Sequence, residues 1–448
     1  MNLEIKVGHE IIGEIKPLHA CVGGPKTGGP YLPNDVSNIF NEIGIPSCRL
    51  HDIEGVYGMN QFVDIHCIFP NFDANENDEN NYNFTMTDKY LTAIKNCGSQ
   101  IYYRLGETID HFDKKLFINP PKDFLKWAKI CEHVIRHYNE GWANGYHMDI
   151  KHWEIWGEPE GKKLWGGTNK QFYELYTITA KHLKSCFPNI KIGGYSAVGF
   201  YSLTRDWDRP WFNSIIPFMD GFFDYIKGKD VPLDFFSWHC YALSPEEVSR
   251  SCEIIRAYLD NKGYTKTESH LVEFNMFYSL REPDWPQITL AQHEEHASDI
   301  LSTLIECSDA NVDMLFYYDL RGGNTNYNGV YHNDTLFGKI ELLPGFYSLK
   351  FFGDLYRLKN RIKIDYEKDN GLYSLGATDG DNTVVIISNR EYDGRIIFTT
   401  DAKKIELTDI SGKLTNRKCI IKNNVLYSNN EKYIFEAQKN HIYRIELK

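Results

Sequence analysis

The sequence lacks the cysteine spacing of a disulfide framework or of a zinc site. Its ten cysteines are scattered, with no CxxC pair. Several of them lie inside apolar runs, namely Cys21, Cys48 and Cys240. Small buried thiols of this kind are typical of a reducing compartment, so we expect free cysteines.

Long hydrophobic runs are also missing. No stretch approaches the 18 or so apolar residues of a membrane span. The first residues, MNLEIKVGHE, contain no apolar signal region. These absences predict a cytoplasmic protein with no membrane contact, unless a leader has already been removed.

An excess of basic residues is missing as well. The chain has 49 Lys and Arg against 61 Asp and Glu, a formal charge of −12. An acidic surface argues against nucleic acids and anionic membranes as partners. The loop GGPKTGGP lacks the Lys-Ser/Thr ending of a phosphate-binding loop, which argues against a nucleotide.

Metal and cofactor signals are weak. In the segment HEEH at residues 293–296, the two histidines stand three apart, whereas HExxH zinc sites need four. We interpret this segment as a solvated helix face. The Asp/Asn-rich segment within residues 57–84 fits no calcium loop and is expected to be a solvated loop. The sequence therefore predicts no metal and no cofactor.

Aromatic residues are plentiful, at 14% of the chain with 9 Trp and 29 Tyr. Aromatic rings match the apolar faces of sugars, but they are equally suited to a hydrophobic core. This enrichment leaves both interpretations open.

Strand and helix patterns alternate along most of the chain. Apolar runs typical of strands occur at residues 18–22, 46–52, 101–105, 152–156, 191–196, 234–241, 270–275 and 312–320. Amphipathic helix patterns follow them, including residues 34–43, 121–139, 169–186, 246–261, 290–308 and 344–353. Eight such pairs are the count of a (β/α)₈ barrel, which we place at residues 15–355.

After residue 355 the pattern changes to short β-rich segments separated by turn residues. This favours a small β-sandwich over residues 356–448. Residues 1–14 also have a strand pattern, and we expect this N-terminal strand to join the sandwich.

Two glutamates lie where predicted strands end. Glu158 follows the run HWEIWG, and Gly157 and Pro159 end this predicted strand. Glu273 lies near the C-terminal end of the run HLVEF. In a barrel, chemistry sits at the C-terminal ends of strands. Glu158 alone is as well explained by a carboxylate facing solvent as by a general acid with a raised pKa. The second glutamate decides, because glycoside hydrolysis requires a pair of carboxylates.

These stretches resemble a known family. WEIWGEPE is similar to the WEVWNEP acid/base motif of clan A glycoside hydrolases. HLVEFN is similar to the strand-seven nucleophile motif of glycoside hydrolase family 39, which includes β-xylosidases and α-L-iduronidases. SCRLHDI and LFGKIELLPGFYSLKFFGDL resemble further segments of that family, so the resemblance covers about residues 15–355.

The resemblance implies a retaining double displacement, with Glu158 as acid/base and Glu273 as nucleophile. We expect an enzyme of the β-xylosidase type that acts in exo fashion on a plant or host glycan oligosaccharide. Arg49 is the natural cation to keep Glu273 ionised, and Tyr241 would donate a hydrogen bond to it. Glu154 is the rival acid/base, but its earlier place in the strand predicts a deeper position.

Four further residues have two interpretations each. His51 and His239 would reach sugar hydroxyls from strands two and six, or they would be satisfied core histidines. Trp156 and Tyr318 would stack on a sugar face, or they would simply fill the barrel.

Gly157 departs from the clan motif, which has Asn at this position to bind the sugar 2-hydroxyl. That contact can supply several kcal/mol at the transition state. We expect a void or a water molecule beside Gly157, an enlarged subsite, and poor activity on simple xylosides.

Two alternatives remain at this point. One is another clan A exoglycosidase, such as an α-L-arabinofuranosidase. The other is a non-catalytic carbohydrate-binding barrel, against which the presence of both glutamates argues. The expected partner is an oligosaccharide or glycoside, and the oligomeric state stays open.

Overall fold

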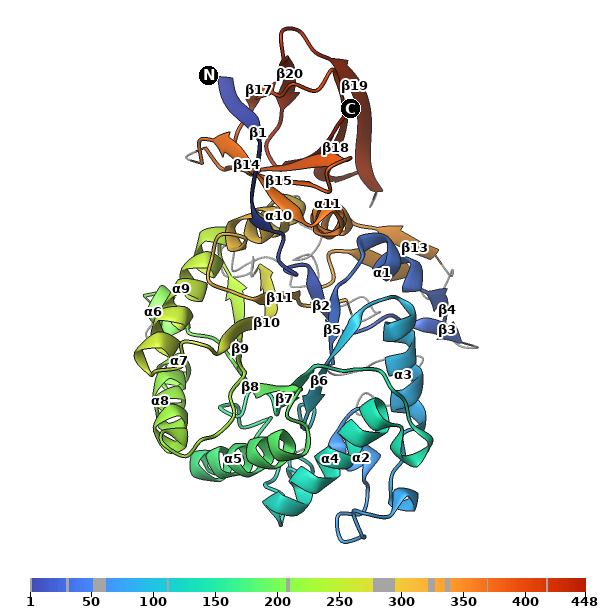
Figure 1. Ribbon diagram of the computed structural model, residues 1–448, viewed down its shortest axis with the longest axis vertical. Helices are drawn as coiled ribbons and strands as arrows, with labels where there is room; N and C mark the ends of the chain where they lie inside the picture. The colour runs from blue at the N-terminus through green and yellow to red at the C-terminus, as the bar shows by residue number, and fades with distance from the viewer. Residues whose placement is uncertain are drawn as a thin grey trace.

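The computed structural model describes residues 2–29, 32–50, 62–110, 113–206, 210–276, 295–320, 327–334, 339–368, 370–415 and 418–448. Figure 1 shows two parts, a barrel surrounded by helices and a domain made of strands beside it. The first strand and the last eight all belong to the second part.

Eight parallel strands close the barrel, so the predicted (β/α)₈ fold is confirmed. Around the barrel the order follows the chain, as expected when each strand pairs with the next. The strands are β2 (Ala20–Val22), β5 (Ser47–Arg49), β6 (Gln100–Leu105), β7 (His152–Ile155), β8 (Lys191–Ala197), β9 (Phe235–Ala242), β10 (Glu268–Met276) and β11 (Met314–Tyr317).

Helices cover the outside of the barrel (Figure 1). They are α1 (Ser37–Ile43), α2 (Ile65–Ile68), α3 (Thr85–Asn96), α4 (Phe124–Glu140), α5 (Asn169–Cys186), α6 (Tyr201–Thr204), α7 (Pro210–Asn213), α8 (Ile215–Ile226), α9 (Pro245–Asn261), α10 (His296–Cys307) and α11 (Pro344–Leu358). Two single 3₁₀ turns, η1 (Glu79–Asn81) and η2 (Trp142–Asn144), lie in connecting segments.

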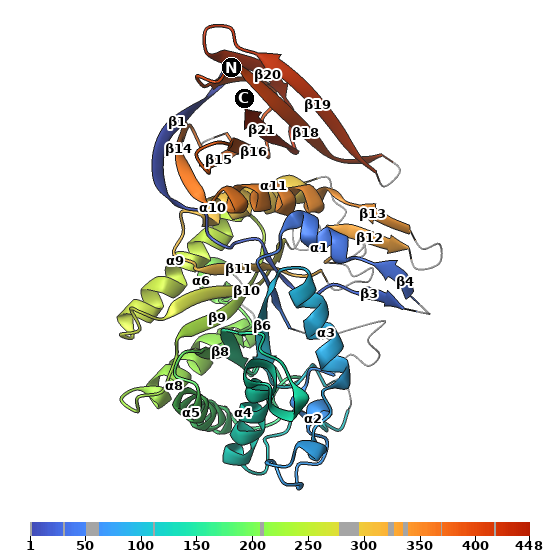
Figure 2. The same ribbon diagram turned by 45° about the vertical axis from the view of Figure 1, so that its right-hand side comes forward.

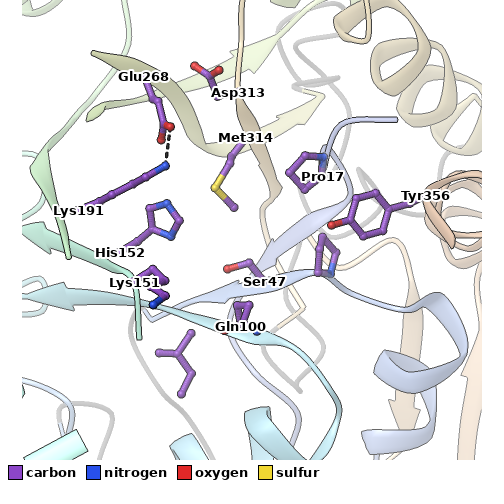
Figure 3. Close-up of a pocket in the computed structure, with 12 residues that line it drawn as sticks. Pro17, Ser47, Gln100, Lys151, His152, Lys191, Glu268, Asp313, Met314 and Tyr356 are labelled. Atoms are coloured by element: carbon purple, nitrogen blue, oxygen red, sulfur yellow. Dashed lines mark hydrogen bonds and ion pairs between the residues drawn. The ribbon is translucent and has the colours of Figure 1, made fainter. Parts of the chain in front are cut away.

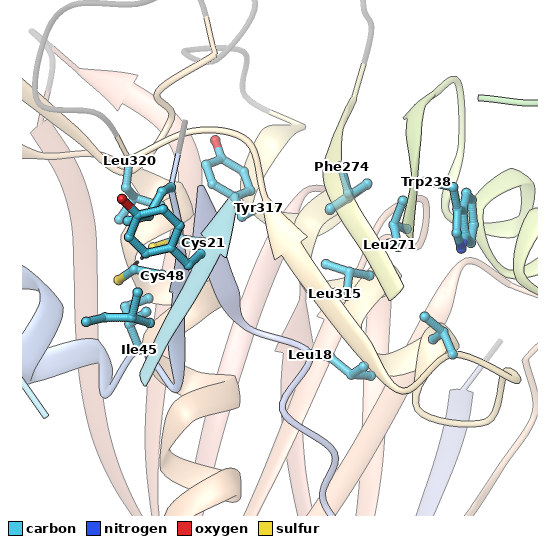
Figure 4. Packing of buried hydrophobic residues seen from close by; sticks show 14 of the residues in the cluster. Leu18, Cys21, Ile45, Cys48, Trp238, Leu271, Phe274, Leu315, Tyr317 and Leu320 are labelled. Carbon is cyan, nitrogen blue, oxygen red and sulfur yellow. Dashed lines mark hydrogen bonds between the residues drawn. The ribbon is translucent and has the colours of Figure 1, made fainter. Parts of the chain in front are cut away.

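Strand alternation sorts the side chains between the inside and the outside of the barrel. On β7, Trp153 and Ile155 belong to the large core between strands and helices, part of which Figure 4 shows around β9, β10 and β11. A smaller apolar cluster belongs to the barrel interior and includes Val22, Tyr102, Phe235, Val272 and Phe316. These side chains fill the barrel, so it has a packed interior.

The second domain is one sheet of nine strands in the order β19-β18-β21-β16-β15-β14-β1-β17-β20. Its strands are β1 (Asn2–Glu14), β14 (Asn360–Tyr366), β15 (Leu372–Thr378), β16 (Thr383–Asn389), β17 (Gly394–Thr399), β18 (Lys404–Thr415), β19 (Lys418–Tyr427), β20 (Lys432–Ala437) and β21 (His441–Leu447). Strands from distant parts of the sheet share one core, with Ile5, Phe398 and Ile405 among its members. The sheet therefore folds over on itself to make a sandwich-like core.

Helices α10 and α11 lie between the barrel and the sheet domain in both ribbon views (Figure 2). Ser302 of α10 donates a hydrogen bond to Ser388 of β16 at 3.0 Å. Ion pairs add to this interface, from Arg390 to Asp299 at 2.7 Å and from Arg444 to Asp354 at 2.9 Å. The two parts are thus joined by buried polar contacts as well as by chain connections.

Several details differ from the sequence-based expectations. Residues 34 and 35 belong to a short strand, β4 (Leu32–Asp35), which pairs with β3 (Thr27–Gly29) inside the predicted Gly/Pro loop. The predicted polar loop contains helix α2. A further hairpin, β12 (Tyr331–Asp334) and β13 (Lys339–Leu342), precedes α11.

The predicted helix at residues 290–308 is described from residue 295 onward. Within HEEH, His293 lies outside the described residues, whereas His296 is 1% exposed and bonded to the Tyr317 hydroxyl. The prediction of a solvated face is therefore wrong for His296, because α10 turns it toward β11. All ten cysteines are free, as expected. Within the described ranges, no helix combines the length and apolarity needed to cross a bilayer.

Candidate active site

Polar side chains gather at the C-terminal ends of β5 to β10. They come from the last residue of β5, the end of β7 and the segment after it, and the later residues of β8, β9 and β10. The residues are Arg49, Glu154, Glu158, Ser196, His239, Tyr241 and Glu273. This is the barrel end at which (β/α)₈ enzymes carry out their chemistry.

Arg49 is the centre of this cluster and is 1% exposed. Its guanidinium donates to Glu154 at 2.8 Å, to Glu273 at 3.0 Å and to the Ser196 hydroxyl at 2.8 Å. A buried cation between two carboxylates compensates part of their charge and fixes their orientation. The expected pairing of Arg49 with Glu273 is present.

Glu273 is directed into the barrel mouth by an irregularity of β10. The register between β9 and β10 shifts between Leu271 and Glu273. Such a bulge re-aims the following side chain. The Tyr241 hydroxyl donates to Glu273 Oε2 at 2.8 Å. Burial, and then the charge of Glu273, raise the pKa of Tyr241 well above its usual range, so the phenol remains a donor.

Glu158 stands on a loop that leaves β7 in an unusual conformation. Trp156 and Glu158 both have left-handed backbone angles, with φ of 68° and 45°. Non-glycine residues adopt this region at a cost, and such residues cluster at functional sites. The Glu158 amide donates to the Ser196 carbonyl at 3.1 Å, which ties the loop to β8.

His239 connects the two candidate carboxylates. Its Nδ1 lies 2.9 Å from Glu158 Oε1, and its Nε2 lies 2.5 Å from Ser196 Oγ and 3.5 Å from Glu273 Oε1. One oxygen of Glu158 and one of Glu273 lie within 4.8 Å of each other. Both glutamates therefore face the same small volume.

One arrangement of protons satisfies the hydrogen bonds of Arg49, Ser196, His239 and Glu158 together. Arg49 has only protons to give, so Ser196 Oγ accepts from it. The Ser196 proton is then free to be donated to His239 Nε2. A neutral His239 consequently holds its proton on Nδ1 and donates it to Glu158. The chain Arg49–Ser196–His239–Glu158 is thus oriented from one end to the other.

Glu154 and Glu158 lie at different depths. The Glu154 side chain is fully buried and ion-paired with Arg49, and its Oε1 has no hydrogen-bond partner in the described residues. The Glu158 side chain is 26% exposed. The sequence-based expectation that Glu154 sits deeper agrees with this arrangement.

The aromatic candidates occupy different places. Trp156 is 1% exposed, donates to the Leu164 carbonyl and packs against Trp127 and Trp165, so it fills the core. Tyr318 stands edge-on to Tyr241, with ring centroids 5.8 Å apart, and therefore lies beside the carboxylate site. His51 lies outside the described residues.

The space beside Gly157 is lined by cations. A Cβ built there would lie 3.5 Å from Arg104 Cδ and 4.0 Å from Arg49 Nη2. A side chain added at residue 157 would thus lie beside a second buried arginine, Arg104. Arg104 is held by Asp64 at 3.0 Å and by the Glu107 carbonyl at 3.0 Å.

Sequence reasoning missed Ser196 and Arg104. Ser196 ends a predicted strand, but the register of β8 against β9 shifts between Gly194 and Ala197, and strand alternation cannot reveal that shift. Arg104 lies on predicted strand three, two residues after Tyr102, so alternation along β6 was the available signal.

Comparisons with known proteins find a matching family. The model of the family described as "Glycosyl hydrolases family 39" matches residues 40–275. A β-xylosidase of Geobacillus stearothermophilus is 24% identical over 231 residues, which are 45% of this chain and 42% of that protein. The alignment thus spans less than half of this relative.

Solved structures share the whole architecture. A glucosidase from Croceicoccus marinus superposes with a TM-score of 0.76 at 21% identity, covering 100% of this chain and 99% of the other. A monomeric β-xylosidase from Caulobacter crescentus CB15 has a TM-score of 0.71 at 14% identity, with the same coverage. A family 51 α-L-arabinofuranosidase from Thermotoga petrophila RKU-1 gives 0.66 at 12% identity, covering 100% of both chains. At sequence identities of 12% to 21%, these similarities show a shared fold alone.

Proposed function

The chain belongs to glycoside hydrolase family 39, and from that premise we propose that it is a retaining glycosidase working by double displacement. Glu273 is the nucleophile and Glu158 the acid/base. The enzyme acts in exo fashion on oligosaccharides.

One observation carries the mechanism: oxygens of Glu158 and Glu273 lie within 4.8 Å of each other. Retaining enzymes hold their carboxyl groups about 5–5.5 Å apart, whereas inverting enzymes need about 6.5–9.5 Å to admit a water molecule. The short separation supports direct attack by one carboxylate on the anomeric carbon.

The partners of the two glutamates support their different roles. Glu273 receives hydrogen bonds from Arg49 and Tyr241, which stabilise its ionised form. A carboxylate held in this way is ready to form the glycosyl–enzyme ester. Glu158 has one oxygen engaged by His239, which leaves the other to carry the proton for the leaving group.

In the first step, Glu273 attacks the anomeric carbon while Glu158 gives its proton to the glycosidic oxygen, and the bond to the leaving group breaks. In the second step, the Glu158 carboxylate removes a proton from water. The resulting nucleophile attacks the same carbon and displaces Glu273. The His239 hydrogen bond to Glu158 strengthens whenever Glu158 is ionised, which stabilises the intermediate state.

The substrate that we propose is a plant or host oligosaccharide with a β-linked sugar at its non-reducing end. The relatives are a β-xylosidase and a glucosidase, so pentosides and hexosides are the first sugars to test. Gly157 removes the amide of the clan motif, and Arg104 and Arg49 line the space it leaves. We infer that these arginines act on the 2-position of the sugar in its place.

An α-L-arabinofuranosidase is the second candidate, because a family 51 enzyme of that activity has the same architecture. A panel of aryl glycosides, with pentopyranosides, hexopyranosides, uronides and arabinofuranosides, separates the two. Arabinofuranoside hydrolysis well above that of every pyranoside favours this second candidate.

The mechanism is tested with 2-deoxy-2-fluoro glycosides that carry a dinitrophenyl leaving group. The fluorine slows both steps and the leaving group speeds the first, so a covalent intermediate accumulates. Mass spectrometry of digested protein should find the sugar on Glu273. Hydrolysis of an aryl glycoside with inversion of the anomeric centre would overturn the proposal, as would binding without any hydrolysis.

A further inference from the structure

A second polar cluster lies at the opposite, N-terminal end of the barrel. There a cavity of about 400 Å³ is lined by the first residues of six strands, Ser47, Gln100, His152, Lys191, Glu268 and Met314 (Figure 3). It is separated from the Glu158–Glu273 site by the apolar side chains that fill the barrel. The mechanism described above uses none of these residues.

Three side chains of this end converge on one point. Ligand atoms of His152, Glu268 and His270 all lie within 4.8 Å of one another. His270 Nε2 is 3.1 Å from Glu268 Oε2. The Nε2 atom of His152 is buried and has no hydrogen-bond partner in the described part of the chain. A buried nitrogen without a partner costs free energy unless something binds it.

We propose that His152, Glu268 and His270 bind a divalent transition-metal ion of the zinc type. Two imidazoles and one carboxylate make a common zinc ligand set, and the fourth position is left for water or a small ligand. The cavity supplies that open position. Ligands in a tetrahedral site stand a little over 3 Å apart, so small side-chain rotations bring the three atoms into place.

The surroundings support the ligand geometry. The Tyr102 hydroxyl lies 3.2 Å from His270 Nδ1, which orients the ring and leaves Nε2 for the metal. Lys191 contacts Glu268 Oε1 at 2.5 Å (Figure 3), so Oε2 is the oxygen that faces His270 Nε2, and a metal between these two atoms would replace their hydrogen bond. Outer partners of this kind fix the orientation of metal ligands.

The two lysines beside the cavity raise the alternative of an anion site. Both amines are already engaged, Lys191 with Glu268 at 2.5 Å and Lys151 with Asp149 at 2.5 Å. The unsatisfied atom is His152 Nε2, an acceptor when its ring proton is on Nδ1. An unpaired acceptor favours a cation over an anion.

The three proposed metal ligands come from two strands. His152 begins β7, and Glu268 and His270 begin β10. The far ends of the same strands lead to Glu158 and Glu273. A metal at this end would therefore link the starts of the two strands that carry the catalytic pair, and it would stabilise the folded barrel by binding it in preference to the unfolded chain.

The test uses the full chain after treatment with a chelator. Co²⁺ is titrated into the protein, because cobalt replaces zinc in such sites and gives visible absorption bands when four or five ligands surround it. One equivalent should bind, and Zn²⁺ should displace it and raise the Tm. His152→Gln should weaken Co²⁺ binding at least about tenfold, since even outer partners of ligands contribute that much.

The control is His182→Gln. His182 belongs to another group of potential ligands on the protein's outside, with Glu132 and Cys186, and its replacement should leave the cobalt spectrum and affinity unchanged. Circular dichroism and the Tm without metal check that each variant folds. If His152→Gln does not fold, Glu268→Gln makes the same test.

Three results would overturn the proposal. Cobalt binding that His152→Gln or Glu268→Gln leaves intact would place the ion elsewhere, as would binding lost in His182→Gln. Stabilisation by inorganic phosphate but not by Zn²⁺ would make the cavity an anion site held by Lys151 and Lys191.

Discussion

The two ends of the barrel carry similar groups in different states. At the C-terminal end, His239 stands between two glutamates, and both of its nitrogens have partners. At the N-terminal end, His152 and His270 stand beside one glutamate, and His152 Nε2 has no partner in the described residues. Strands β7 and β10 contribute to both clusters.

The difference lies in how each cluster is held. Arg49 and Ser196 orient the C-terminal cluster, so each carboxylate there has a fixed environment before substrate arrives. This is preorganisation, which lowers the cost of stabilising charge in a transition state. In the N-terminal cluster, His152 Nε2 has no hydrogen-bond partner among the described residues, so it remains able to bind a ligand. The comparison predicts that substitutions at the two ends affect different properties.

The largest effect should come from Glu273→Gln. Removing the nucleophile should lower kcat by roughly 10⁴- to 10⁶-fold, as loss of such groups does elsewhere. Steady-state kinetics on the best aryl glycoside measures the loss. At the other end, Asp313→Asn should leave kcat unchanged, because the amide oxygen can still accept from the Ser269 amide. Comparable losses of kcat in both variants would show that catalysis is not confined to the C-terminal end of the barrel.

Glu158→Gln should lower kcat roughly 10²- to 10⁴-fold on substrates with poor leaving groups. Dinitrophenyl glycosides need no proton to leave, so their first step should be affected much less. Glu154→Gln is the matched control: if this variant shows the dependence on leaving group instead, the acid/base role belongs to Glu154.

Arg49→Met should destabilise the protein by about 3–5 kcal/mol, because it leaves Glu154 and Glu273 buried without their cation. Urea unfolding at neutral pH measures the change. Arg395→Met, which breaks an exposed pair with Glu436, should have no measurable effect. Equal stability of the two variants would show that Arg49 does not hold the C-terminal cluster together.

Gly157→Asn should raise kcat/KM on an aryl β-xyloside by up to roughly 10²-fold, if it restores a hydrogen bond to the 2-hydroxyl. The site accepts a Cβ, which would approach Arg104 Cδ to 3.5 Å and Arg49 Nη2 to 4.0 Å. Activity on the natural substrate should fall at the same time. A wild type that is already fully active on xylosides, and is unchanged by the substitution, would contradict the inference about the 2-position.

The smallest effect concerns His19, which precedes β2 at the N-terminal end of the barrel. Burial lowers the pKa of His19 from 6.5 to about 3. Below pH 6.5 the unfolded chain binds a proton that the folded protein rejects, so stability is lost as pH falls from about 6.5 to about 3. At about pH 5 this loss is about 2 kcal/mol.

The variant His19→Gln keeps a donor for the Gly44 carbonyl and should remove this acid-dependent loss. Urea unfolding at about pH 8 and pH 5 measures it, with the exposed His147→Gln as control. If His19→Gln and the wild type lose equal stability between these two pH values, His19 does not contribute.

The sequence predicts the strands and the two glutamates because apolar runs and turn residues are local signals. It also predicts Arg49 and Tyr241, which alternation places on the inside of their strands. It does not predict Ser196 or the direction of Glu273, because register shifts in β8 and β10 decide them. The His152–Glu268–His270 cluster is invisible for another reason: His152 lies far from Glu268 and His270 in the chain, and only closure of the barrel brings it to them.

Strand β1 has a consequence for biosynthesis. It is synthesised before the barrel, yet its neighbours in the sheet, β14 and β17, are synthesised after the barrel. During translation its apolar residues Leu3, Ile5 and Val7 must wait, unpaired, until the whole barrel has left the ribosome. An exposed strand edge of this kind can pair with other chains. Slow synthesis of the last ninety or so residues should therefore increase aggregation, and a chaperone that covers residues 2–14 should reduce it.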